Sequence, residues 1–169
     1  MGRPLRTRID FAKTLSWYDF FHNQLIAFGK IKNDFGLAKL LCKDTEKSHE
    51  SNLFKKYKFG LSTPQQEWID IIDSKCIGSS NIINHSIWKN LKYRTTEEKL
   101  ILIELNNLPN YIFENLIING HIKDFNKSDL EKLAQYGSLD SLCALYLLHQ
   151  WGYSIGSTSR LCCTKKKKK

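Results

Sequence analysis

Residues 35–73 constrain the fold most, because they contain three consecutive short segments with the apolar spacing of helices. In the first segment, 36–41, apolar residues recur at i, i+3 and i+4, the spacing of one buried helical face. The second segment, 51–58, mixes aromatic residues with lysines at helical spacing. We expect the third segment to begin at Thr63, whose hydroxyl can cap a helix that continues through Ile72. The pattern therefore predicts three short helices separated by turns.

The middle segment has two chemically different faces. Its apolar and aromatic side chains fall on one side of a helix: Leu53, Phe54 and Tyr57. Its polar and basic side chains fall largely on the other sides: Asn52, Lys55, Lys56 and Lys58. Gly60 is placed to end the helix. One face can therefore pack against the protein while the other contacts phosphate groups.

The order of these helices, with Leu37 and Leu41 in the first, Ser51 and Tyr57 in the second and a third led by Pro64, resembles the helix-turn-helix core of the lambda-repressor-like superfamily. The resemblance covers about residues 35–73. It implies that the helix after the turn lies in the major groove of DNA. Carried over by position, the DNA-contacting residues would be Ser51, Asn52, Lys55 and Lys56, and we add Lys58 because of its charge.

The segment from Cys42 to Glu50 departs from that motif. It is longer than the turn of roughly 3 or 4 residues that helix-turn-helix proteins use, and it contains no glycine. The alternative is a helical hairpin with a lysine-rich outer face. The opening Gly-Arg-Pro and the pair Ile87-Trp88 also resemble uncharacterised bacterial proteins, which implies no activity.

The N-terminus is basic, with Arg3, Arg6 and Arg8 among its first eight residues. The Gly2-Arg3-Pro4 sequence resembles the core of an AT-hook, whose narrow extended chain places arginines in an A·T-rich minor groove. The alternative is a disordered basic start. We expect all three arginines to contact DNA.

Positive charge is concentrated in particular segments of the chain. The net charge is +9, and residues 39–60 contain six lysines against three acidic residues. The last five residues, 165–169, are all lysine. Such clusters are typical of a surface that binds a polyanion, although lysine also serves simply to keep a protein in solution. The Cys162-Cys163 pair beside the lysine tail allows a membrane role, but we favour a non-specific electrostatic tail.

Patterns typical of enzymes are missing from the sequence. The five histidines stand singly and match no known catalytic spacing. The five cysteines have no C-x-x-C pairing and form no zinc signature. The candidate magnesium ligands stand at expected helix starts or solvent faces, where acidic residues are common: Asp70, Asp73, Glu97 and Glu98. We therefore expect no catalysis, no cofactor and no bound metal.

The rest of the chain also predicts helices. Amphipathic or apolar periodicity marks four further segments: 9–28, 110–119, 128–136 and 139–151. A capping pattern at Thr95 to Glu98 predicts another helix before Pro109. The 139–151 segment is apolar almost all round, so we expect Leu142 to be buried in the core or in a dimer interface.

Together these patterns predict an all-α protein with a helix-turn-helix-like domain and a supporting helical layer. The expected parts are a basic arm (1–13), the DNA-binding domain (14–90), a C-terminal helical region (91–156) and a disordered basic tail (157–169). We expect a transcriptional or mobile-element regulator that binds double-stranded DNA and possesses no catalytic activity. Its C-terminal helices either support the first domain or form a homodimer. The alternative is a helical protein-interaction or assembly subunit with an incidental basic surface. Neither a signal peptide nor an apolar run long enough for a membrane is visible, so we expect a cytoplasmic protein.

Overall fold

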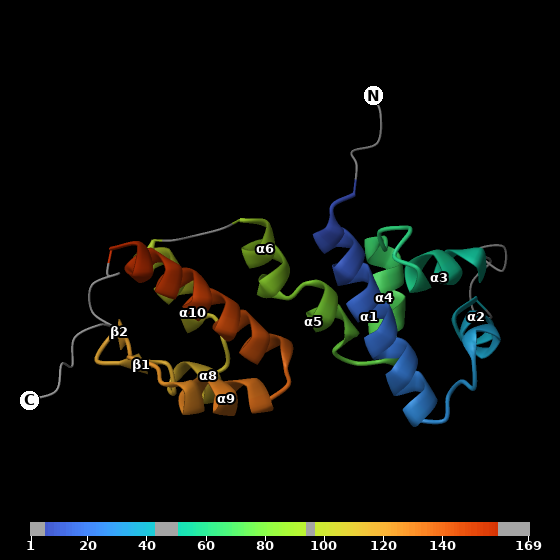
Figure 1. Cartoon of the computed structure of the whole chain (residues 1–169). Coiled ribbons are helices and arrows are strands. Elements are labelled where there is room, and N and C mark those ends of the chain that lie inside the picture. The colour runs from blue at the N-terminus through green and yellow to red at the C-terminus, as the bar shows by residue number, and fades with distance from the viewer. Residues whose placement is uncertain (1–5, 43–50, 94–96, 159–169) are drawn as a thin grey trace, which may run out of the picture. The chain divides into compact units, whose positions relative to one another are not determined.

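The computed structural model describes residues 6–42, 51–93 and 97–158, without the side chains of Cys42, Ser51 and residues 153–158. The described chain is mostly helical and contains one two-stranded sheet. It divides into two compact units, residues 1–88 and 89–169 (Figure 1). Arg3 and the greater part of both the long turn and the basic tail lie outside the described residues.

Helix α1 (Arg8–Ala27) is the longest helix of the first unit and confirms the helix predicted at 9–28. It begins with a capping box, in which the Thr7 hydroxyl accepts from the Asp10 N–H and the Asp10 carboxylate accepts from the Thr7 N–H. Gly29, at φ 67°, ends it by taking a left-handed conformation. The residues that α1 buries are Thr14, Trp17, Tyr18, Phe21 and Leu25.

Three helices follow, each near its predicted place: α2 (Asp34–Cys42), α3 (Ser51–Lys58) and α4 (Gln66–Lys75). Helix α3 packs against both α1 and α2. Its Tyr57 ring lies 5.6 Å from the Trp17 ring of α1, and its Phe54 ring lies 5.0 Å from the Trp68 ring of α4. These edge-to-face contacts lie in the core of the first unit.

The predicted cap of α4 is wrong. Thr63 does not cap the helix, because Gln65 is still extended and stands at the N-cap without a side-chain hydrogen bond. The short helix α5 (Ser79–Ile83), which forms after Gly78, is not among the helices predicted from the sequence. The Asp73 carboxylate accepts from the Ser80 N–H at 2.8 Å and from the Ser79 hydroxyl at 3.1 Å. A carboxylate of α4 therefore supplies the cap of α5, and the Ser80 N–H lowers the pKa of Asp73.

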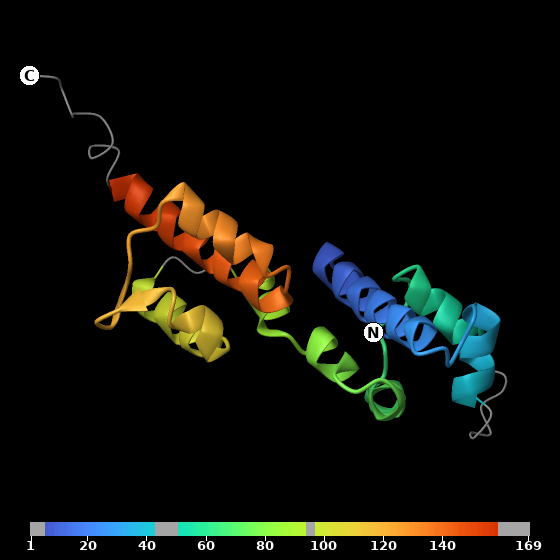
Figure 2. The ribbon, with the colours of Figure 1, turned by 90° about the horizontal axis from the view of Figure 1, so that it is seen from below.

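Helix α6 (Ser86–Lys92) crosses the boundary between the units in sequence. In the second unit, α7 (Glu98–Asn106), α8 (Asn110–Phe113) and α9 (Lys127–Gln135) each contact the long α10 (Leu139–Thr158). Helices α9 and α10 lie side by side in both views (Figures 1 and 2). The core of this unit is lined by buried apolar side chains: Ile101, Leu105, Ile112, Leu116, Leu133, Cys143, Ala144 and Leu147.

The second unit differs from the prediction at several helix ends. Glu97 is the N-cap of α7 and makes no side-chain cap bond, while Thr95 and Thr96 lie outside the described residues. Helix α9 begins earlier than predicted, because Asn126 forms a capping box with Asp129. Leu142 is 53% exposed, because α10 buries its opposite side against its neighbours.

The helix predicted at 110–119 is replaced after α8 by a small antiparallel hairpin, β1 (Ile117–Ile118) and β2 (His121–Ile122). Its turn consists of Asn119 at φ 50° and Gly120 at φ 79°. Two successive positive φ angles are what an Asn-Gly hairpin turn requires, and Ile118 pairs with His121 directly across this turn. The local turn preference therefore overrides the helical apolar spacing of this segment.

Candidate nucleic-acid interface

Helix α3 has a buried side and an exposed side. Phe54 and Tyr57 are 3% and 0% exposed. Asn52, Lys55 and Lys56 are exposed, and their i, i+3 and i+4 spacing places them together on the outer side of the helix. This segregation agrees with the two-faced helix predicted from the sequence. The side chain of Ser51 is outside the described part of the structure.

The three lysines of α3 differ in what they contact. Within the described residues, the side chains of Lys55 and Lys56 form no hydrogen bond or ion pair. Lys58 instead donates to the Asp34 carboxylate of α2, with Nζ 2.6 Å from Oδ2. Lys55 and Lys56 are therefore available to an external anion, whereas an anion must compete with Asp34 for Lys58.

Asp34 connects three helices. Its Oδ1 accepts from the Tyr18 hydroxyl of α1 at 3.2 Å and lies 3.0 Å from His22 Nε2 of the same helix. The hydrogen bond from Lys58 lowers the pKa of the Asp34 carboxyl. Burial, with Asp34 close by, raises the pKa of Tyr18. Asp34 is thus held as an anion, and the charge on Lys58 compensates it.

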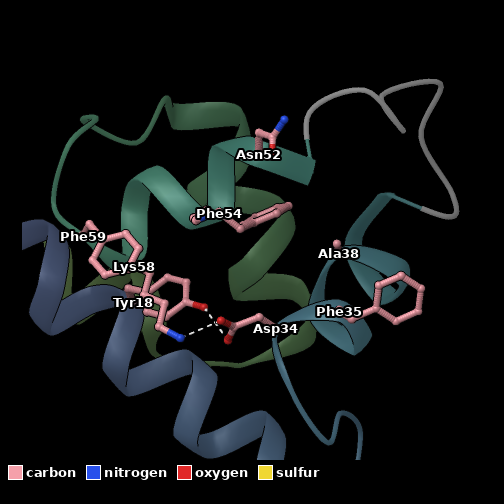
Figure 3. A pocket seen from close by; sticks show the side chains of 9 residues that line it. Tyr18, Asp34, Phe35, Ala38, Asn52, Phe54, Lys58 and Phe59 are labelled. Carbon is pink, nitrogen blue, oxygen red and sulfur yellow. Dashed lines mark hydrogen bonds and ion pairs between the residues drawn. The ribbon is translucent and has the colours of Figure 1, made fainter.

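A hollow of about 430 Å³ lies beside these groups (Figure 3). It is lined by nine residues from α1, α2, α3 and the residue following α3: Tyr18, Asp34, Phe35, Ala38, Asn52, Phe54, Lys55, Lys58 and Phe59. Phe35 and Phe59 are 79% and 50% exposed and stand at opposite ends of the hollow, with Phe54 between them. No functional role was predicted for Phe35, Phe59 or Asp34. No local pattern marks Asp34, whose partner Lys58 is 24 residues away.

The N-terminal arginines have different environments. The Arg6 guanidinium donates to the Gly60 carbonyl, to the Asp10 carbonyl at 3.0 Å and to the Thr14 hydroxyl at 2.9 Å. Arg6 therefore ties the start of α1 to Gly60, two residues after the end of α3. Its contact with DNA stays a prediction. Arg8 is exposed in the first turn of α1, and Arg3 lies outside the described residues.

Gly60 lies at φ 61°, and a Cβ added there would come within 2.5 Å of the Phe11 ring. Only glycine combines this backbone conformation with so close an approach. The junction of Arg6, Phe11 and Gly60 therefore fixes the C-terminal end of α3 against α1.

Two of the carboxylates considered as magnesium ligands have local structural roles. Asp70 accepts from the Gln66 amide at 2.8 Å, and Asp73 caps α5. Glu97 stands at the N-cap of α7 without a side-chain cap bond. Among the described residues, there is no group of three or more His, Cys, Asp or Glu side chains that could hold a metal ion. None of the helices described is both long enough and apolar enough to cross a bilayer.

Comparison with known proteins adds no family to this picture. The chain matches no family model, no curated protein and no solved structure.

Proposed function

We propose that this protein binds duplex DNA through the outer side of α3 and acts as a transcriptional or mobile-element regulator without catalysis. The observation that carries the proposal is the exposure of Asn52, Lys55 and Lys56 on one side of a helix whose other side is buried in the core. A helix supported in this way can enter the major groove, which is wide enough to admit it.

The three residues have different tasks in this proposal. The charged side chains of Lys55 and Lys56 have no partner among the described residues, which suits contacts with phosphates. The amide of Asn52 can donate and accept at once, so it can pair with both N6 and N7 of adenine. Arg8 is a candidate for a further phosphate contact. Lys58 contributes less, because Asp34 already binds it.

A role in protein assembly is the second candidate function. Apolar side chains of the second unit are exposed on α7, the hairpin and α10: Leu100, Ile103, Ile118 and Leu142. Exposed apolar surface favours association with another chain. Light scattering decides whether the protein is a homodimer, and duplex binding decides between the two functions.

We expect Lys55→Ala and Lys56→Ala each to weaken binding to all duplex sequences alike, because each removes one phosphate contact. The slope of log K against log salt should flatten by about 0.9 for each lysine removed. Fluorescence anisotropy with a labelled duplex at a series of salt concentrations measures this slope. Lys99→Ala, at an exposed lysine of α7, is the matched control and should leave the slope unchanged. An unchanged slope in both α3 variants contradicts a phosphate-binding role for α3.

Asn52→Ala should instead relax sequence preference while largely preserving non-specific affinity. A bidentate amide–adenine pair contributes about 1–3 kcal/mol of discrimination against other bases. Selection of bound sequences from random duplex DNA, performed with the wild type and the variant, measures the preference at each position. Asn23→Ala, at an exposed asparagine of α1, serves as the control. The same consensus at the same strength for wild type and Asn52→Ala rules out α3 as the recognition helix.

A further inference from the structure

The hollow between α2 and α3 has features that a duplex-binding helix does not require. Two phenylalanine rings, Phe35 and Phe59, stand exposed at its ends (Figure 3). Its volume of about 430 Å³ lies within the range of roughly 300–1,000 Å³ that small-ligand sites occupy. The rings of Tyr18 and Phe54 complete the aromatic part of its lining. Aromatic side chains exposed beside a cavity favour a planar partner that can cover them.

The polar lining indicates the charge of that partner. Lys55 is cationic and has no partner within the described part of the chain. Among the described residues that line the hollow, Asp34 is the only acidic one, and Lys58 lies 2.6 Å from it in the same lining. Because these two charges compensate each other, the described lining carries one uncompensated positive charge, on Lys55. The Asn52 amide adds a neutral donor and acceptor to the lining.

We propose that this hollow binds single-stranded nucleic acid by stacking unpaired bases on Phe35 and Phe59 and holding a phosphate on Lys55. Aromatic platforms combined with lysines are the means by which proteins bind single strands without sequence preference. The two rings stand at opposite ends of the hollow, so they stack different bases of the strand and do not clamp one base from both sides. Asn52 contacts the edge of a base between them.

This inference rests on the proposed function, because it names a second form of nucleic acid for the same side of α3. A duplex does not offer the same contact, because its bases are stacked on one another and their faces are covered. Phe35 and Phe59 therefore distinguish single strands from duplexes, whereas Lys56, which is outside the lining of the hollow, serves the duplex.

The test measures fluorescence anisotropy of the full chain with three labelled probes: an oligodeoxyuridylate, an oligouridylate and a random duplex. Phe35→Ala and Phe59→Ala should each weaken binding of both single strands by about 5-fold to 150-fold, the equivalent of one base–aromatic stack. Both variants should keep duplex affinity within about 2-fold, because phosphate contacts dominate there. The two single-stranded probes show whether the sugar matters: equal affinity indicates binding through base and phosphate alone, and a preference assigns the site to DNA or RNA.

Phe28→Ala is the matched control, because Phe28 is 68% exposed in the same unit but does not line the hollow. Phe59→Tyr keeps the stacking ring and should keep affinity for single strands. All four phenylalanine substitutions lie at exposed positions. Circular dichroism verifies that each variant is folded.

The outcomes separate this inference from the proposed function. Duplex binding combined with no affinity for single strands, or with affinity that Phe35→Ala and Phe59→Ala leave unchanged, overturns the inference and leaves the duplex proposal standing. Ring-dependent binding of single strands without duplex binding supports the inference and rejects the duplex proposal. Failure to bind any of the three probes overturns both.

Discussion

Leu147→Asp is expected to unfold the C-terminal unit. Leu147 is 0% exposed on the side of α10 that packs against its neighbouring helices. The substitution leaves a cavity and places an unpaired charge in an apolar core, so we expect a loss of more than about 4 kcal/mol in the free energy of unfolding. Circular dichroism during urea titration measures the loss, and the helical signal of α7 to α10 should disappear without denaturant.

Leu142→Asp on the same helix is the matched control. Leu142 is 53% exposed, so a charge there remains in contact with water. We expect the free energy of unfolding to change by no more than about 1 kcal/mol. If Leu142 belongs to a dimer interface, the mass of the protein in solution should decrease. Equal destabilisation by the two substitutions would show that α10 buries a different side from the one described.

Trp68→Ala should produce the largest loss of stability in the N-terminal unit, about 3–5 kcal/mol. Trp68 is 0% exposed, and its ring lies 5.0 Å from that of Phe54, a core residue of α3. Removing the indole therefore also removes support from the proposed recognition helix. Urea denaturation measures the loss, and anisotropy at a temperature where the variant is still folded should show weaker duplex binding.

Trp68→Phe is the control for this second substitution. It keeps an aromatic ring for Phe54 to contact, so it should lower the free energy of unfolding less than Trp68→Ala does and should preserve DNA binding. If Trp68→Ala lowers stability but leaves duplex affinity unchanged, the position of α3 does not depend on this contact, and the proposed link between the core and the interface fails.

Local patterns predicted helices α1 to α4 of the first unit but not α5. The spacing of Trp17, Phe21 and Leu25 marks the buried side of α1, and the predicted range of α3 is the observed one. This success has a physical reason, since a helix that packs on one side repeats its apolar residues every three or four positions. The same periodicity was misleading at 110–119, where the Asn119-Gly120 turn determines the structure.

Local sequence patterns did not predict contacts between residues that are far apart in the chain. Asp34 and Lys58 are 24 residues apart, and their pairing depends on how α2 packs against α3. The hollow exists only because three helices meet around it. Sequence spacing located the basic side of α3 but contained no signal for Phe35 and Phe59 as its neighbours. Arg6 was assigned to DNA from its charge, whereas its hydrogen bonds lie within the chain.

The bond between Arg6 and Gly60 has a consequence for how the protein is made. Its two partners are 54 residues apart, and ribosomes add about 5–20 residues per second. Helix α1 therefore leaves the ribosome several seconds before Gly60, which binds Arg6, and Tyr57, which covers Trp17. During that interval its aromatic side is exposed to the cell, which makes the nascent N-terminal helix a natural target for chaperones that bind apolar segments.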